Sequence, residues 1–272
     1  MILTRHELRQ ARTSWLIWTG SVAFLLAVCV FLFPEMKDQM AGVNKLFASM
    51  GSFTAAFGLD RLNFGTLTGY YAVECGNVLG LGGAFFAALC SVVVLSKEEK
   101  DRTAEFLLTH PVSRVCVVSE KLLAVFIQFF ALNLAVWLIA AGCIAAVGET
   151  VPWKELNLMH LAYTLMQLVI AGICFGISAF IRRSSAGVGI GIAAVLYVLS
   201  LFSNIAESAK FLKILTPFGF CDGADIVSKG TLNGTGITVG AVLCVLGILA
   251  AYLWYPRKAD YVDIGIIRLM RR

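Results

Sequence analysis

The sequence predicts an all-α membrane protein with six transmembrane helices, on three observations. Hydrophobic residues make up 59% of the 272 positions and charged residues 14%, whereas soluble domains average about 45–50% apolar and about 25% charged. Six apolar segments approach or exceed the length of about 20 residues that a bilayer-crossing helix needs. A charged, helix-prone segment at residues 97–114 separates the second apolar segment from the third.

No polar block is large enough to fold as a second, soluble domain, so we expect one transmembrane domain over residues 1–272. The expected spans cover about residues 15–33, 72–95, 122–147, 158–181, 187–205 and 237–255. The stretch 46–58 is also apolar, but it is too short to span and is broken by Gly51 and Ser52. We expect an interfacial or re-entrant piece there.

Lys and Arg are distributed unevenly between alternate loops. With the N-terminus inside, fifteen of the 22 basic residues fall in inner segments and seven in outer segments. The positive-inside rule then places both termini in the cytoplasm of a multi-pass protein of the cell (plasma) membrane. The formal net charge of +5 reflects these loops, and we expect the lipid bilayer, with no nucleic acid, as partner.

The N-terminal residues before the first span have an amphipathic pattern. Between arginines, the sequence places at helical spacing Leu3, Leu8, Ala11 and Trp15. This pattern predicts a short amphipathic helix on the inner membrane surface, with a flexible tail carrying stop-transfer charges as the alternative. A cleaved signal peptide is disfavoured, because residues 33–35 offer no small-residue cleavage site.

Ionisable residues are nearly absent from the spans: Glu74 and His160 lie at outer mouths, and the other polar residues include Gln128, Asn133 and Gln167. Ion-driven carriers more often place a carboxylate or a broken-helix ion site at mid-depth, so we expect the energy source elsewhere. One of the three amides is expected to line a translocation path. Hydrogen bonding between helices is the alternative reading.

Motifs for catalysis and nucleotide binding do not occur in the sequence. It contains no H-E-x-x-H, G-x-S-x-G or G-x-x-x-x-G-K-[ST] motif, and its eight cysteines include no C-x-x-C pair. We therefore expect neither an enzyme nor a metal site in this chain. A disulfide between Cys75 and Cys221 remains an alternative to single packing thiols.

Glycines four residues apart recur in four spans, a spacing that lets helices approach closely in lipid. The pairs are Gly76 with Gly80, Gly172 with Gly176, Gly187 with Gly191, and Gly236 with Gly240. They favour a tightly packed bundle or a dimer.

The charged segment, KEEKDRTAEFLLTHPVSR, begins with acids that complement the positive end of a helix dipole, and Pro111 ends the predicted helix. Phe106, Leu107 and Leu108 form an apolar knob beside a charged face, which suits docking into a groove of another protein. The alternative is a juxtamembrane loop whose apolar residues dip into the lipid headgroups.

The charged segment resembles the cytoplasmic loop of type-2 ABC exporter permeases, with acids, a Leu-rich helix, Pro-Val-Ser-Arg and a Lys entering the next span. The matching residues are Glu98, Glu99, Thr103, Glu105, Leu107, Leu108, Pro111, Val112, Ser113, Arg114 and Lys121. Arg102 stands where the family usually has glycine, which leaves open whether the helix turns there. The resemblance continues at residues 216–218 and 222–225, which are similar to the family's outer-loop pattern.

In that family the loop is a coupling helix that docks on a separate ATPase, and the N-terminal helix is an elbow helix. The resemblance thus implies an ATPase contact made by Glu98, Glu99, Arg102, Thr103, Glu105, Leu108, Pro111, Val112, Ser113 and Arg114. Residues 111–114 would return the force to the third span.

The resemblance further implies a permease dimer with two ATPase subunits, which bind ATP and Mg²⁺, and no cofactor in this chain. The expected function is export of a hydrophobic or amphipathic compound such as a drug, antibiotic, peptide or lipid-like molecule. Two alternatives stay open. One is a secondary carrier; the other is a non-transporting scaffold or sensor that docks a soluble partner through the charged segment.

Overall fold

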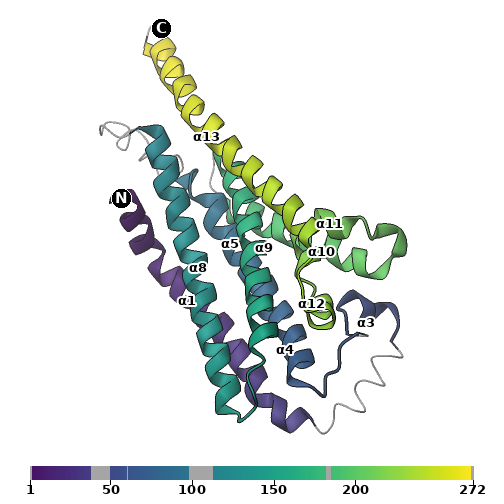
Figure 1. Ribbon diagram of the computed structural model, residues 1–272. Helices are drawn as coiled ribbons and strands as arrows, with labels where there is room; N and C mark the ends of the chain where they lie inside the picture. Colours follow the sequence, from purple (N-terminus) through teal and green to yellow (C-terminus); the bar gives the residue numbers. More distant parts are fainter. Residues whose placement is uncertain (1, 38–49, 60, 98–112, 182–184, 271–272) are drawn as a thin grey trace.

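The computed structural model describes residues 2–37, 50–59, 61–97, 113–181 and 185–270, and the regular elements in these ranges are all helices (Figure 1). Six helical spans are long and apolar enough to cross a membrane, which confirms the predicted number. They cover Ile2–Lys37 (α1), Leu67–Val93 (α4 Leu67–Cys75, the π-helix η1 Gly76–Leu81 and α5 Gly82–Val93), Arg114–Ala146 (α8), Trp153–Phe180 (α9), Ala186–Ile205 (α10) and Gly234–Arg257 within α13 (Gly234–Met270). The short helices are α3 (Ser52–Ala56), η2 (Glu207–Ala209), α11 (Leu212–Leu215), η3 (Pro217–Phe220) and α12 (Gly223–Lys229).

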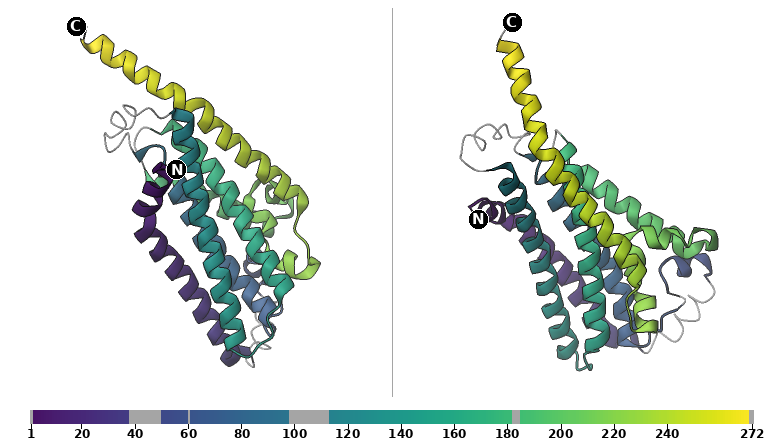
Figure 2. Two further views of the ribbon diagram at one scale, coloured as in Figure 1. Left: turned by 60° about the vertical axis from the view of Figure 1, so that its left-hand side comes forward. Right: turned by 45° about the horizontal axis from the view of Figure 1, so that its top comes forward.

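Successive long helices run in opposite directions, so both ends of the chain lie toward one end of the bundle (Figures 1 and 2). We call this the terminal end; it carries Ile2, Lys97 and Arg114. The opposite end carries the turn between α8 and α9 and the chain before α4. The two flanks of the charged segment are thus beside the start of α1.

Helix α9 is the centre of the bundle, with 67% of its most apolar window buried. It packs mainly on α13 and α5, while α1 lies along α8 (Figure 2). Close approach to α13 depends on glycine, because a Cβ on Gly172 would lie 2.5 Å from Cys244 Sγ and one on Gly176 would lie 2.5 Å from the Gly247 carbonyl oxygen. This glycine pair therefore packs helices within one chain.

The two predicted glycine pairs of α13 and α10 differ in what they face. A Cβ on Gly236 would lie 3.1 Å from Phe220, and one on Gly240 would lie 3.0 Å from Val169, so this pair also faces the interior. Gly191 of α10 has no neighbour within 4 Å among the described residues. The described part of the chain thus leaves the surface around Gly191 uncovered.

Several helix boundaries differ from the predicted ones. The expected separate N-terminal helix is continuous with the first span, because α1 runs without a break from Ile2 to Lys37. The third span begins at Arg114 rather than at residue 122, and the fourth begins at Trp153 rather than at residue 158. Hydropathy finds only the apolar part of a helix, whereas hydrogen bonding continues it through polar residues at either end.

Two predictions concern the opposite end. Of the stretch expected to be interfacial or re-entrant, residues 50–58 contain the short helix α3, which packs on α10. The disulfide alternative is wrong, because Cys75 and Cys221 are both free and buried. Cys221 instead donates a hydrogen bond to the Ala162 carbonyl oxygen at 3.1 Å.

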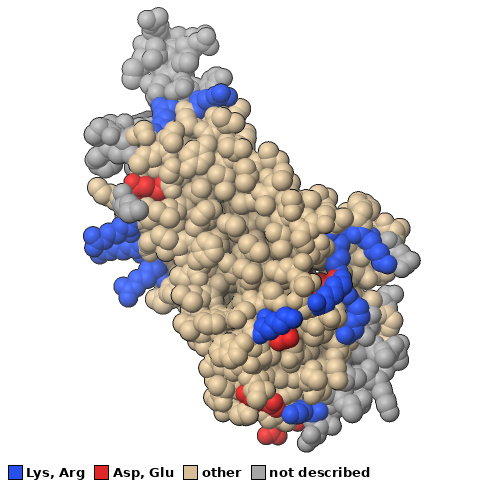
Figure 3. Space-filling model, viewed as in Figure 1, with Lys and Arg blue, Asp and Glu red and all other residues tan. Residues whose placement is uncertain are grey.

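The charged side chains on one face of the molecule are unevenly distributed (Figure 3). On the face shown in Figure 3, Lys, Arg, Asp and Glu side chains lie toward the two ends, and uncharged surface occupies the stretch between them. This distribution is typical of a protein whose middle lies in hydrocarbon and whose ends lie in water.

Candidate functional site

Glu7 of α1 is buried at the terminal end, with 7% of its side chain exposed. Its carboxylate accepts a hydrogen bond from Lys121 Nζ of α8 at 3.1 Å and another from Lys97 Nζ, just after α5. Lys121 has no exposed side-chain surface and also donates to the Val94 carbonyl oxygen at 2.6 Å. Buried charges persist only when they are paired and hydrogen-bonded. We call Glu7, Lys97 and Lys121 the Glu7 network.

Further hydrogen bonds join α1 to α8 near its start and to Lys97 after α5. The Thr4 backbone N–H donates to Glu120 Oε2 at 3.0 Å, and the Thr4 hydroxyl donates to the Glu120 carbonyl oxygen at 3.2 Å. Lys97 Nζ donates to Gln10 Oε1 at 2.6 Å. The first turns of α1 are therefore bonded to residues on both sides of the charged segment.

Two of the predicted ATPase-contact residues are described. Ser113 caps α8, because its hydroxyl oxygen accepts from the Cys116 N–H at 3.2 Å. Arg114 Nη1 donates to the Pro256 carbonyl oxygen at 2.5 Å, which ties the start of α8 to α13. The other predicted contact residues lie outside the described ranges: Glu98, Glu99, Arg102, Thr103, Glu105, Leu108, Pro111 and Val112.

Gln128, one of the three predicted path residues, lines a pocket at the terminal end together with Trp18 of α1 and with Phe86 and Cys90 of α5. Its Nε2 donates to the Ala124 carbonyl oxygen at 3.1 Å. Cys90 Sγ donates to its Oε1 at 3.6 Å. Glu7 and Lys97 line the same pocket, so Gln128 lies in a cavity that also borders the Glu7 network.

Asn133 and Gln167, the other two path candidates, are bonded to each other. Asn133 Nδ2 of α8 donates to Gln167 Oε1 of α9 at 2.6 Å, and both side chains are buried. Gly83 of α5 lies against them, because a Cβ there would be 2.1 Å from Gln167 Nε2. For these two residues the structure contains the hydrogen bond between helices that was the alternative reading.

Toward the opposite end, five charged residues form an ion cluster: Arg61, Lys213, Asp222, Asp225 and Lys229. Asp222 lies 2.8 Å from Arg61 Nη2 and 2.9 Å from Lys213 Nζ. Asp225 lies 2.9 Å from Arg61 Nη1, 2.5 Å from Lys213 Nζ and 3.3 Å from Lys229 Nζ. The cluster connects the chain before α4 to α11 and α12.

The pKa values in the ion cluster follow from competition between burial and charge. Burial by itself raises the pKa of Asp222 and Asp225, but the positive charges of Lys213 and Arg61 outweigh it and hold both below their ordinary value. Burial lowers the pKa of Lys213, but the two carboxylates outweigh it and raise that pKa above its ordinary value. Asp222, Asp225 and Lys213 are therefore ionised at neutral pH.

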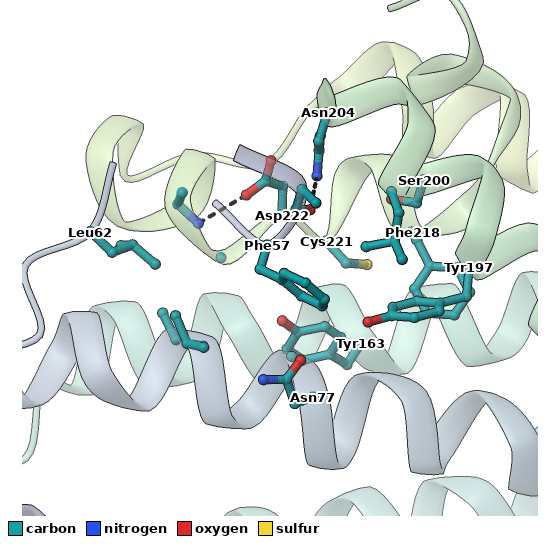
Figure 4. A pocket seen from close by; sticks show the side chains of 17 residues that line it. Phe57, Leu62, Asn77, Tyr163, Tyr197, Ser200, Asn204, Phe218, Cys221 and Asp222 are labelled. Atoms are coloured by element: carbon teal, nitrogen blue, oxygen red, sulfur yellow. Dashed lines mark hydrogen bonds between the residues drawn. The ribbon is translucent and has the colours of Figure 1, made fainter. Parts of the chain in front are cut away.

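Beside the ion cluster is a pocket that we call the tyrosine pocket (Figure 4). Its lining includes Asn77 of η1, Tyr163 of α9, Tyr197 of α10, Phe57 after α3 and Phe218 of η3. In Figure 4 the Tyr197 hydroxyl and the Asn77 amide point toward Tyr163, with the Phe57 ring on the other side of the space. Aromatic and uncharged polar groups are thus combined in one cavity.

The π-helix η1 forms one wall of the tyrosine pocket. A Cβ on Gly76 would lie 3.1 Å from the Tyr163 hydroxyl, and one on Gly80 would lie 3.0 Å from its ring. The missing side chains let Tyr163 lie directly against η1, so this glycine pair also packs within the chain. Single π-turns in α-helices frequently occur at functional sites.

The chain that covers the pocket is held by a glycine turn and a polar tie. Gly58, directly after Phe57, has φ of 68°, a conformation that side-chain-bearing residues rarely adopt. Asn204 Nδ2 of α10 donates to the Ala56 carbonyl oxygen at 3.0 Å. Phe57 is therefore fixed over the cavity by its neighbours on both sides.

Sequence reasoning did not identify the Glu7 network or the tyrosine pocket. A signal for the first exists, because Glu7 is the single carboxylate among the basic residues before the first span. The tyrosine pocket joins residues from separate spans, and its assembly depends on packing. In the described part of the chain, no group of three or more His, Cys, Asp or Glu side chains is placed to hold a metal ion.

Comparison with protein families adds an independent finding. Residues 1–255 match the family model described as ABC-2 family transporter protein. No curated protein and no solved structure gives a significant match. The family match covers almost the whole chain: it includes the first five candidate spans in full and the sixth as far as residue 255. The chain therefore belongs to the ABC-2 transporter family, as a multi-pass membrane subunit of an ABC transporter.

Proposed function

We propose that this chain is the permease of an ATP-driven exporter and that the charged segment docks on a separate ATPase subunit as a coupling helix. The observation that carries the proposal is the anchoring of both flanks: Lys97 and Lys121 meet on Glu7, and Arg114 is bonded to α13. A displacement of the charged segment is then passed to four long helices at once. ATP and Mg²⁺ bind to the partner subunit.

In this proposal the terminal end faces the cytoplasm, where ATP is available. The excess of Lys and Arg in inner segments supports that orientation. The membrane is the cell membrane, and the direction of transport is outward.

A second permease copy is proposed to pack on α10. Only 22% of the most apolar window of α10 is buried in the chain, and Val188, Val195 and Val198 are exposed. Gly191 lies on the helix without a close neighbour in the described structure, which leaves room for a partner helix to approach.

The proposed cargo is hydrophobic or amphipathic. The cavity beside Gln128 combines the aromatic residues Trp18 and Phe86 with an uncharged amide. Ligand sites usually consist of such apolar walls with a few polar groups.

The proposal is tested by affinity purification of the tagged chain in mild detergent. We expect a second protein carrying a G-x-x-x-x-G-K-[ST] motif to co-purify, and the reconstituted complex to move a fluorescent amphiphile only with hydrolysable ATP. Transport that survives ATP depletion and stops with an uncoupler would establish a secondary carrier instead. ATP hydrolysis without any cargo movement would favour a scaffold or sensor.

A further inference from the structure

Tyr163 is a buried residue whose hydroxyl makes no hydrogen bond within the described structure. Its side chain lies at the centre of the bundle with 2% of the residue exposed. No described residue is hydrogen-bonded to its hydroxyl, and this hydroxyl faces the tyrosine pocket (Figure 4). The Tyr163 hydroxyl is not one of the fully buried polar atoms that lack a partner in the described residues, so it borders the open space of the pocket, where water or a ligand group can bond to it.

Other unpaired polar groups surround the same space. The Tyr197 hydroxyl, the Asn77 amide and the Ser200 hydroxyl line the pocket, and in the described structure none of them has a side-chain hydrogen bond. They come from α10 and η1, whereas Tyr163 comes from α9. Three of the candidate spans therefore direct hydrogen-bonding groups into one cavity, where a single ligand group can bond to several of them.

The charge of the pocket limits what it can bind. Its polar groups named above are uncharged, and the carboxylate at its edge, Asp222, is already paired with Arg61 and Lys213. A charged ligand group would be desolvated there without a free counter-charge. An uncharged hydroxyl, amide or carbonyl group would instead replace its bonds to water with bonds to the tyrosines and Asn77.

The apolar part of the lining fits the rest of such a molecule. Phe57 lies over the cavity, and Phe218 packs edge-on against Tyr197 with ring centroids 5.4 Å apart. Aromatic faces provide a large apolar contact area at low cost in side-chain freedom.

We propose that the tyrosine pocket binds the uncharged polar end of an amphipathic molecule, with Tyr163, Tyr197 and Asn77 as its hydrogen-bonding partners. An uncharged polar end on an apolar molecule can belong to exported cargo or to a neutral membrane lipid. We assign the occupant as cargo, an assignment that rests on the proposed function.

The test uses the full chain in nanodiscs and a monoacylglycerol that carries a diazirine close to its glycerol group. Two matched probes have the same acyl chain with a carboxylate or a trimethylammonium head. After illumination and digestion, we expect the monoacylglycerol to label peptides containing Tyr163 or Tyr197, and the charged probes to label them several-fold less.

Substitutions connect the labelling to the pocket. Tyr163→Phe removes one hydrogen-bonding group and keeps the ring, so labelling should fall about fivefold. Asn77→Leu, at an exposed position, should give a similar loss. Tyr70→Phe is the matched control, because Tyr70 is also buried but does not line this pocket. Equal labelling by all three probes, or wild-type labelling of Tyr163→Phe and Asn77→Leu, would overturn the proposal.

A second arm separates this inference from the exporter function. In the complex with a co-purified ATPase, cargo should be released on ATP hydrolysis, which lowers labelling, whereas labelling unaffected by ATP would overturn the assignment of the occupant as cargo. Labelling that needs Tyr163 without any ATPase partner would support the pocket and contradict the exporter. ATP-driven transport together with labelling that does not depend on Tyr163 would support the exporter and contradict the pocket.

Discussion

Lys121 is a buried ammonium group that would be costly to leave without its partner. It has no exposed surface, and its ammonium is bonded to the Glu7 carboxylate and to the Val94 carbonyl oxygen. Removing one member of a buried ion pair costs about 3–5 kcal/mol, whereas replacing both with apolar residues of similar size is often neutral. The effect of the Glu7–Lys121 pair on the stability of the fold can therefore be separated from its proposed role in transmitting movement of the charged segment.

We predict that Glu7→Gln lowers the thermal unfolding temperature, because two lysines then remain near an uncharged amide. The double variant Glu7→Leu with Lys121→Met should recover most of the lost stability. If the Glu7 network transmits motion, the double variant should still bind the ATPase but export poorly. Arg9→Gln, at an exposed position of α1, is the control. A Glu7→Gln protein as stable as wild type would contradict the structure.

Asn133 and Gln167 provide a second residue-scale prediction. Asn133→Leu alone leaves the buried Gln167 amide unpaired, at about 1–3 kcal/mol, and the double Leu variant should recover stability. Gln167→Leu alone should cost less, because Asn133 Nδ2 still donates to the Phe129 carbonyl oxygen at 2.8 Å. Because the two amides bond to each other, we expect ATP-driven export by the double variant to stay close to wild type. Export lost in a stable double variant would instead place these residues in the translocation path.

At the scale of elements, α11 and α12 depend on the ion cluster, and its contribution varies with pH. Folding lowers the pKa of Asp222 and Asp225, so their stabilisation is present above the unfolded pKa of about 3.9 and is lost as pH falls through the lower folded values. Folding raises the pKa of Lys213, so its stabilisation is present below the unfolded value of about 10.4 and is lost as pH rises through the higher folded value.

We therefore predict that Lys213→Met weakens α12 most between about pH 4 and 10, and little outside that window. The measurement is hydrogen exchange of residues 223–229, compared with wild type at each pH. Part of the cluster is solvent-exposed, so the loss of α12 stability should be about 1 kcal/mol and should shrink in high salt. Lys229→Met is the control, because Lys229 is 66% exposed and should matter less. An equal effect of both variants would contradict this account.

The six spans and their order could be predicted because hydrocarbon selects apolar runs of a fixed length, a property of local sequence. The joining of the N-terminal helix to the first span could not, because Arg5, Arg9 and Arg12 fall below any hydropathy threshold while the backbone continues through them. Of the three amides, sequence alone could not separate Gln128, in a cavity, from Asn133 and Gln167, which bond to each other. That difference depends on which helices are neighbours.

At the scale of the whole complex, the proposed role of the charged segment is to bind the ATPase. Replacing Glu98 and Glu99 together by Lys, or Leu108 by Asp, should uncouple the permease from its ATPase without affecting membrane insertion. The reason is reversal of charge at the start of the predicted helix in the first case, and loss of an apolar contact in the second. Co-purification and ATP-driven export report the result, and Lys229→Met serves as a distant charge control. Undiminished binding and export in both variants would exclude docking through this segment.

Helix α1 gives the molecule a mechanical property of its own. Its 36 residues span about 54 Å at the usual helical rise. Near one end it is bonded to both flanks of the charged segment, and at the other end Lys37 pairs with Glu149 of the α8–α9 turn at 2.9 Å. For a rod of this length, a tilt of about 5° at one end displaces the other by about 5 Å, close to one helical turn. A small rotation at the terminal end thus becomes a movement the size of a side chain at the opposite end of the bundle.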